Sequence, residues 1–147
     1  MVSTRSGLLQ AAQSFCDTFA QQKPPADILV HFSETHQCVV LEHGLPKLGP
    51  FLGKPFLGRQ GVAEYLDVVK EHLSYEDMKF SEFTVDAEAL KVCVKGTARF
   101  TANKTGQGWD ETFIYMLNFD SEGKVTDWKI WADSGALFLA IHGNLVD

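Results

Sequence analysis

The chain has 147 residues, of which 45% are hydrophobic and 22% charged, a composition typical of one soluble globular domain. We therefore expect a single domain over residues 1–147. The formal net charge of −6 and the three scattered arginines argue against a nucleic-acid partner, because phosphate binding requires clustered Lys and Arg. No apolar run approaches the roughly 20 residues that a membrane-spanning helix needs, so no membrane partner is expected.

The N-terminus leads directly into an amphipathic pattern instead of an unbroken apolar segment, which predicts a cytoplasmic protein. Cys16, Cys38 and Cys93 lie far apart and form neither a C-x-x-C pair nor a zinc-type spacing with histidine. We expect buried, reduced thiols. We also expect no metal site and no cofactor, because the sequence contains no metal cluster and no Gly-rich phosphate loop.

Apolar residues recur at helical spacing near the N-terminus, which predicts an amphipathic helix from about Ser6 to Gln22. Lys23-Pro24-Pro25 ends this helix. The second proline can begin a short helix over 26–32, because proline fits the first helical turn. Residues 36–43 are predicted to form a strand.

Residues 44–58 form a loop rich in glycine and proline that nevertheless carries many large apolar side chains. A loop of this kind usually folds over the core as a lid or lip. Phe51 and Phe56 are its candidate ligand-facing residues. An apolar stripe over 62–73 then predicts a third helix.

From Ser74 the hydrophobic period changes to two. Four strands are predicted, over 78–85, 90–102, 109–120 and 124–132. Short turns join them, so neighbouring strands should be antiparallel. The expected fold class is therefore α+β, with N-terminal helices, a curved antiparallel meander and an apolar helical tail.

The even-numbered side chains of the strand 90–102 are predicted to face the core, since the odd-numbered ones are mostly charged or polar. Gly96 and Ala98 leave room in the middle of that face, as expected where something other than side chains fills the interior. In the strand 109–120 we place the more aromatic face inward: Trp109, Glu111, Phe113, Tyr115, Leu117 and Phe119.

The turn before the last strand allows two registers. A three-residue hairpin with a bulge places Trp131 inward and brings Glu111 level with Asp133. A four-residue loop places Trp128 inward instead. Glycine is preferred at the end of a bulged turn, and Gly123 therefore favours the first register.

Under the favoured register, Glu111, Tyr115 and Asp133 converge at one end of the sheet, and they are the candidate catalytic residues. Burial raises the pKa of a carboxyl group towards neutrality, where one group can act as a base and its neighbour as an acid. A tyrosine hydroxyl can hold a developing oxyanion. The candidate ligand-binding residues are Trp109, Phe113, Trp131, Leu117, Phe51, Phe56 and His43.

Structural roles remain open for each candidate. Asp133 is also suited to cap the terminal helix. Tyr115 can be a core aromatic with a satisfied hydroxyl, and Glu111 can lie at an exposed sheet edge. His43 can be a surface or hydrogen-bonded structural histidine.

Three features now occur together: the order of these elements, a helix that starts Gly58-Arg59-Gln60-Gly61-Val62-Ala63-Glu64-Tyr65-Leu66, and the pattern EGKVTDW…WADSGAL over 122–137. Together they resemble the nuclear transport factor 2-like superfamily, and within it the SnoaL-like, polyketide cyclase-like branch. The resemblance covers nearly the whole chain. It implies a cone in which helices wrap a bent sheet around an apolar cavity, usually in a homodimer. The cyclases use an Asp at the end of the last strand as acid or base, and Asp133 matches that position.

The superfamily also includes ketosteroid isomerase, scytalone dehydratase, limonene epoxide hydrolase, fungal isomerases and non-catalytic binders. The epoxide hydrolase pattern needs an Arg two residues from a carboxylate, whereas Arg99 is flanked by Thr97 and Thr101. The paired pocket histidines of scytalone dehydratase have no match. The resemblance thus implies a cofactor-free lyase, isomerase or cyclase that acts by acid–base chemistry on a small apolar metabolite. The alternative is a non-catalytic ligand-binding or dimeric interaction protein of the same fold.

The outward face of the meander is predicted to carry an apolar patch with Ile114, Met116 and, under the favoured register, Trp128 and Ile130. A contiguous patch of this kind is unusual on a soluble monomer. We therefore expect a symmetric homodimer packed through this face, with Trp128 as the central anchor.

Overall fold

The structure is a computed structural model that describes residues 4–146. The expectation of a cytoplasmic location rests in part on Met1–Ser3, which lie outside the described residues, as does Asp147. Within the described part of the chain, no helix is long and apolar enough to cross a membrane.

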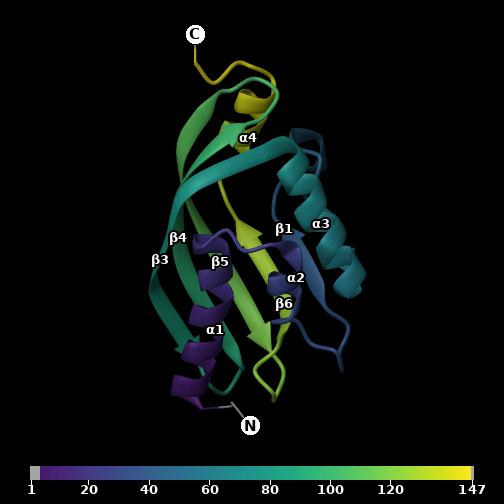
Figure 1. Cartoon of the computed structure of the whole chain (residues 1–147), viewed down its shortest axis with the longest axis vertical. Coiled ribbons are helices and arrows are strands. Elements are labelled where there is room, and N and C mark those ends of the chain that lie inside the picture. Colours follow the sequence, from purple (N-terminus) through teal and green to yellow (C-terminus); the bar gives the residue numbers. More distant parts are fainter. Residues whose placement is uncertain (1–3, 147) are drawn as a thin grey trace.

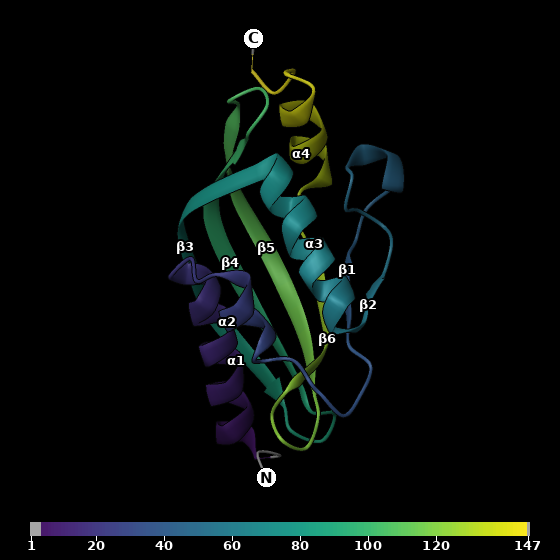
Figure 2. The same cartoon turned by 45° about the vertical axis from the view of Figure 1, so that its right-hand side comes forward.

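Three helices lie on one side of a curved six-stranded sheet, and a fourth lies at its end (Figures 1 and 2). The helices are α1 (Arg5–Ala20), α2 (Pro25–Leu29), α3 (Gly58–His72) and α4 (Ser134–Ile141), with a short 3-10 helix η1 (Pro46–Leu48). The strands are β1 (Val39–Glu42), β2 (Phe56–Leu57), β3 (Leu73–Asp86), β4 (Lys91–Ala102), β5 (Gly108–Phe119) and β6 (Val125–Trp131).

The strand order in the sheet is β2-β1-β6-β5-β4-β3. The predicted α+β class and the antiparallel meander, here β3 to β6, are confirmed. The sequence did not indicate that β1 pairs in parallel with β6, nor that the loop after β1 contributes the two-residue strand β2. The short turns determine the meander, whereas the pairing of β1 joins distant parts of the chain.

The first helix illustrates how the helical side of the molecule is fixed. The Thr4 hydroxyl accepts a hydrogen bond from the backbone N–H of Gly7 and so caps the first turn of α1. Leu8, Phe15 and Phe19 then fall on one buried stripe, where the rings of Phe15 and Phe19 pack edge to face 5.2 Å apart.

The predicted inward faces of β4 and β5 are confirmed by the alternating burial of both strands. The expected gap at Gly96 is wrong, however. The Phe113 ring lies directly over this glycine, so a side chain of the protein fills the space there. Of the three thiols, Cys16 and Cys38 are buried and free, as expected, while Cys93 is free but only half-buried.

The favoured register of the last strand is wrong. Tyr115 pairs with Ile130 and Leu117 pairs with Trp128. Trp128 is consequently 2% exposed in the core, and Trp131 is 39% exposed on the outer face.

The cause of this difference is a second irregularity after the turn. The turn itself is the expected three-residue one, since the Asp120 N–H donates to the Lys124 carbonyl and Gly123 has a φ of +77°. Phe119 then pairs with Val125, but the next pair is shifted by one residue on β6. A single extra residue, Thr126, therefore reverses every side chain that follows it.

The bulge at Thr126 is accommodated because the backbone of Val125 forms hydrogen bonds with residues 31–33. The Val125 N–H donates to the His31 carbonyl at 2.8 Å, and the Ser33 N–H donates to the Val125 carbonyl at 2.9 Å. The backbone of Val125 is thus satisfied by residues 31–33 after α2.

The predicted outward patch changes accordingly. Trp128 and Ile130 lie in the core, so Trp128 is wrong as an interface anchor. On the outer face, Ile114 and Trp131 lie opposite each other and are each 39% exposed.

A buried carboxylate holds the β5–β6 turn against the segment after α2. Asp120 accepts a hydrogen bond from the Ser33 hydroxyl at 2.7 Å. Its other oxygen accepts from the backbone N–H groups of Glu122 and Lys124 at 2.9 Å each. Burial raises the pKa of Asp120, but these hydrogen bonds outweigh burial and the pKa lies below its ordinary value.

Substitution Ser33→Ala should lower the free energy of unfolding near neutral pH by about 1–3 kcal/mol, because it removes a buried hydrogen bond to a charged group. The lowered pKa of Asp120 stabilises the fold above the unfolded pKa, and this contribution is lost as the pH falls through the folded pKa. The variant should therefore lose less stability in acid than the wild type. Urea unfolding at neutral and acidic pH measures both quantities, with Ser81→Ala on the exposed part of β3 as the control. Identical pH dependence in wild type and variant would contradict this assignment.

Candidate functional site

The concave face of the sheet and the three helices enclose a cavity of about 590 Å³. This volume is in the range of sites for small organic molecules. Exposed residues line it at the α1–α2 connection, represented by Lys23, and at the α3–β3 junction, represented by Lys70 and Ser74. The cavity therefore opens to solvent between these two connections.

Aromatic side chains from five elements form much of the wall: Phe19, Tyr65, Phe100, Trp109, Phe113 and Trp128. The rings of Tyr65 and Trp128 meet edge to face at 5.3 Å, and Phe100 stacks on Trp109 at 5.8 Å. Such pairs hold one another in place and leave a rigid apolar wall.

Glu42 at the end of β1 lies in this wall, and its carboxyl group is the best candidate in the cavity for proton transfer. The Tyr65 hydroxyl on α3 donates a hydrogen bond to Glu42 Oε1 at 2.5 Å. Burial raises the pKa of Glu42 to about 7, the hydrogen bond from Tyr65 opposes this shift, and the nearby charge of Glu111 adds to it. A carboxyl group of this pKa both gives and takes a proton near neutrality.

The sequence interpretation did not single out Glu42. A pattern was available, because Cys38, Val40 and Glu42 alternate along one strand and the first two are buried. A glutamate that continues the buried face of a strand is a candidate for an unusual environment.

Glu111 is a second carboxyl group in the lining of the cavity, and it is buried, with 6% of its surface exposed. Its oxygens accept hydrogen bonds from Trp109 Nε1 at 3.1 Å and from the backbone N–H of Asp133 at 3.2 and 3.3 Å. Burial raises its pKa, and the bonds from Trp109 and Asp133 oppose the shift. Glu111 therefore does not lie at an exposed sheet edge; it ties the end of β6 to β5.

Asp133 lies at the rim of the cavity with an exposed side chain. Its Oδ1 accepts a hydrogen bond from the backbone N–H of Ala136 at 3.0 Å and caps α4. Both expectations for its position hold, since the residue caps the helix and also borders the cavity. It meets Glu111 through its backbone.

Tyr115 lines the cavity and is 5% exposed. Burial raises the pKa of its hydroxyl well above the ordinary value, so the group is a neutral donor. Within residues 4–146 this hydroxyl has no hydrogen-bond partner. Its ring packs on those of Phe19 and Trp128 at 5.9 and 5.4 Å.

The structure brings Glu111, Tyr115, Asp133, Trp109 and Phe113 to the cavity. The other candidates lie outside its lining: Leu117, Phe51, Phe56, His43 and Trp131.

Four of these five exclusions have a physical reason in the packing. Phe51 and Phe56 from the lip loop pack on Tyr65, with ring centres 6.1 and 5.5 Å away, and so support the wall from behind. Trp131 lies on the outer face because of the bulge, and His43 stacks on it at 6.1 Å.

Among residues 4–146, no group of three or more His, Cys, Asp and Glu side chains is placed to hold a metal ion. The cavity itself offers a carboxyl group, Glu42, whose pKa suits proton exchange near neutrality, and a hydroxyl group, Tyr115, that can donate a hydrogen bond to an oxygen.

A scan against protein-family models and a search of curated proteins both gave no match. Among solved structures, the chain is similar to a nuclear transport factor 2-like protein of unknown function from Burkholderia pseudomallei, with 17% identity, 91% of this chain and 96% of that chain covered, and a TM-score of 0.77. It is similar to TerC co-crystallised with polyporic acid, with 23% identity, 92% and 98% covered, and a TM-score of 0.75. It is also similar to a protein from Jannaschia provisionally named a SnoaL-like polyketide cyclase, with 14% identity, 91% and 90% covered, and a TM-score of 0.72. These likenesses show that the chain has the nuclear transport factor 2-like fold.

Proposed function

We propose that this chain, with its nuclear transport factor 2-like fold, is a SnoaL-like lyase, isomerase or cyclase that binds a small apolar metabolite in the cavity and acts on it by proton transfer without a cofactor. The observation that carries the proposal is Glu42, a half-buried carboxyl group with a pKa of about 7 in an aromatic cavity of about 590 Å³. The solved structures of similar fold support it, because they include a protein provisionally named a SnoaL-like polyketide cyclase and a protein co-crystallised with polyporic acid. Fold alone does not determine chemistry, so the proposal depends on the residues of the cavity.

In the proposed reaction, the Glu42 carboxylate takes a proton from a carbon next to a carbonyl group of the metabolite. The electron pair of the broken C–H bond moves to the carbonyl oxygen, which accepts a hydrogen bond from the Tyr115 hydroxyl. The proton on Glu42 then returns to a different atom of the same molecule, which gives an isomer, or to a leaving hydroxyl group, which gives an alkene and water. Tyr65 keeps Glu42 in position through its hydrogen bond.

Asp133 and Glu111 have supporting roles in this proposal. Glu111 fixes the start of α4 through the backbone of Asp133, and Asp133 caps that helix. Leu137 of α4 lines the cavity, so the two carboxylates hold this part of the lining in position.

The test begins with the molecule itself. Native mass spectrometry of the purified protein identifies a co-purifying small molecule, which is then returned to the protein in D2O. Proton transfer by Glu42 should introduce deuterium at carbon, as measured by mass spectrometry and proton NMR, while heat-denatured protein should introduce none. A bound molecule that is neither converted nor labelled would contradict the catalytic proposal.

That outcome would favour a second candidate function, a non-catalytic ligand-binding protein of the same fold. The position of Asp133 favours it, because the residue that matches the cyclase acid or base has an exposed side chain engaged in a helix cap.

We also propose a homodimer through the outer face of the sheet, with Trp131 and Ile114 at its centre. Paired apolar side chains on an open sheet face favour burial against a second copy, with about 1,500 Å² covered in total. Trp131→Ala should shift the chain from dimer to monomer in sedimentation at micromolar concentration, whereas Lys79→Ala on β3 should not. A wild-type protein that sediments as a monomer would exclude this assembly.

A further inference from the structure

Gly96 of β4 lies opposite Phe113 of β5, and both face the cavity side of the sheet. The aromatic ring rests on the glycine: a Cβ atom at position 96 would lie 2.2 Å from Phe113 Cε2 and 2.3 Å from Cζ. Such distances are far below van der Waals contact. No side chain at position 96 is compatible with the ring where it lies.

The backbone does not require glycine at this position. Gly96 is absent from the positive-φ residues of the described chain, so an alanine would fit its extended conformation. The requirement comes from the ring alone. Gly96 thus leaves the space in which the Phe113 ring packs.

Phe113 is at the same time part of the cavity wall. Its ring is held by Tyr115 at 5.1 Å and by Phe80 at 5.9 Å. Phe100 meets it edge to face at 6.3 Å. Phe113 borders the open space of the cavity, and a ring displaced from Gly96 would move towards that space.

We propose that Gly96 and Phe113 together determine the largest molecule that the cavity accepts. When the Phe113 ring packs on Gly96, the cavity has its full volume. When a side chain occupies position 96, the ring projects into the cavity. This inference rests on the proposed function in one respect, namely that the ligand occupies this cavity.

The expected change in volume is large. An apolar cavity of about 150 Å³ holds one benzene molecule, so a phenyl ring turned inwards removes at most about that much space. The cavity of about 590 Å³ would then lose up to roughly a quarter of its volume. Larger ring systems should be excluded while smaller ones still fit.

The test uses 2-naphthol, 2-hydroxyanthracene and 1-hydroxypyrene as probes of increasing size. Binding is followed by quenching of tryptophan fluorescence, since Trp109 and Trp128 line the cavity. Gly96→Ala should weaken binding of the pyrene probe by about tenfold or more and leave the naphthol probe within about twofold. Phe113→Leu should bind the pyrene probe more tightly than the wild type, and the double variant should regain the binding lost in Gly96→Ala. Thr97→Ala, on the outer face of β4, is the matched control.

A crystal structure of Gly96→Ala provides a readout that needs no ligand, and it should show the Phe113 ring in a smaller cavity. An unchanged cavity volume, or equal weakening of all three probes, would overturn the proposal. If Gly96→Ala does not fold, Phe113→Leu decides alone, and its failure to tighten pyrene binding overturns it. If the wild type binds no probe, the proposed ligand-binding function fails, while the crystal structure still decides whether Phe113 sets the volume.

Discussion

Glu42→Gln should lower kcat on the identified metabolite by about 10²–10⁴-fold, because a positioned acid or base contributes about that factor. The substitution keeps the shape of the side chain and an oxygen for the Tyr65 hydroxyl, but it removes the group that exchanges the proton. In the wild type, kcat/KM should rise with pH through about 7 as Glu42 ionises. Steady-state turnover across this pH range measures both effects.

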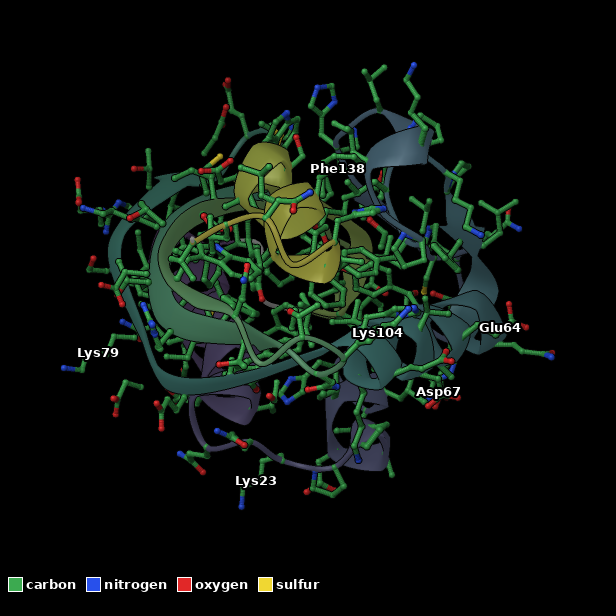
Figure 3. All side chains as sticks on the ribbon, turned by 90° about the horizontal axis from the view of Figure 1, so that it is seen from above. Lys23, Glu64, Asp67, Lys79, Lys104 and Phe138 are labelled. Atoms are coloured by element: carbon green, nitrogen blue, oxygen red, sulfur yellow. The ribbon has the colours of Figure 1, made fainter. Side chains whose placement is uncertain are left out.

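The control for this substitution is Glu64→Gln on the same side of the molecule. Glu64 belongs to α3, and its side chain projects away from the body of the protein (Figure 3). The Glu64→Gln variant should keep full activity and the same pH profile as the wild type. Full turnover in Glu42→Gln would exclude Glu42 as the acid or base.

The same carboxyl group should affect folding stability. Its pKa is raised in the folded state, so the folded protein binds this proton more tightly than the unfolded chain. The stability contribution is greatest below the ordinary pKa of 4.5 and declines as the pH rises to about 7. Glu42→Gln should remove this decline in urea unfolding.

Trp128→Ala should lower the free energy of unfolding by about 3–5 kcal/mol, the cost of removing a fully buried large aromatic side chain. Trp128 is 2% exposed, and its ring packs against those of Phe15 at 5.5 Å and Tyr115 at 5.4 Å. Urea unfolding at a concentration where the chain is monomeric measures the loss.

Trp131→Ala is the matched control, because it removes the same side chain from the outer face of the same strand. It should cost less than about 1 kcal/mol in the monomer, as surface substitutions do. The reverse ranking of the two variants would indicate that the last strand faces the other way.

Trp128 and Trp131 show that the alternation of residue types along a strand is not always sufficient to predict its buried face. Alternation along β4 and β5 correctly predicted their inward faces, because the side-chain period of a strand is a local property. The face of β6 depends on one extra residue, Thr126. That bulge is stabilised by hydrogen bonds between Val125 and residues 31–33, a contact that adjacent residues do not encode.

The candidate site divides in the same way. Glu111 and Tyr115 were predicted correctly to face inward, because they continue the aromatic face of β5. Glu42 continues the alternation of Cys38 and Val40, but its place in the cavity wall depends on the pairing of β1 with β6, where it lies opposite Ile130. Phe51 and Phe56 were expected to face a ligand, but their partner Tyr65 could be identified only from the assembled fold.

The parallel pairing of β1 with β6 has a consequence for the order of folding. Until β6 is available, the described strand β1 has two residue pairs with β2 and the isolated bridge between Glu42 and Leu52, compared with the four pairs that β6 adds. The strand that carries Glu42 therefore gains its main partner from the last quarter of the chain. Closing such a distant contact costs chain entropy before any contact compensates for it, which slows folding. We expect the helices and the β3–β5 hairpins to form early. Glu42, the acid of the proposed reaction, should be among the last residues to reach its native position.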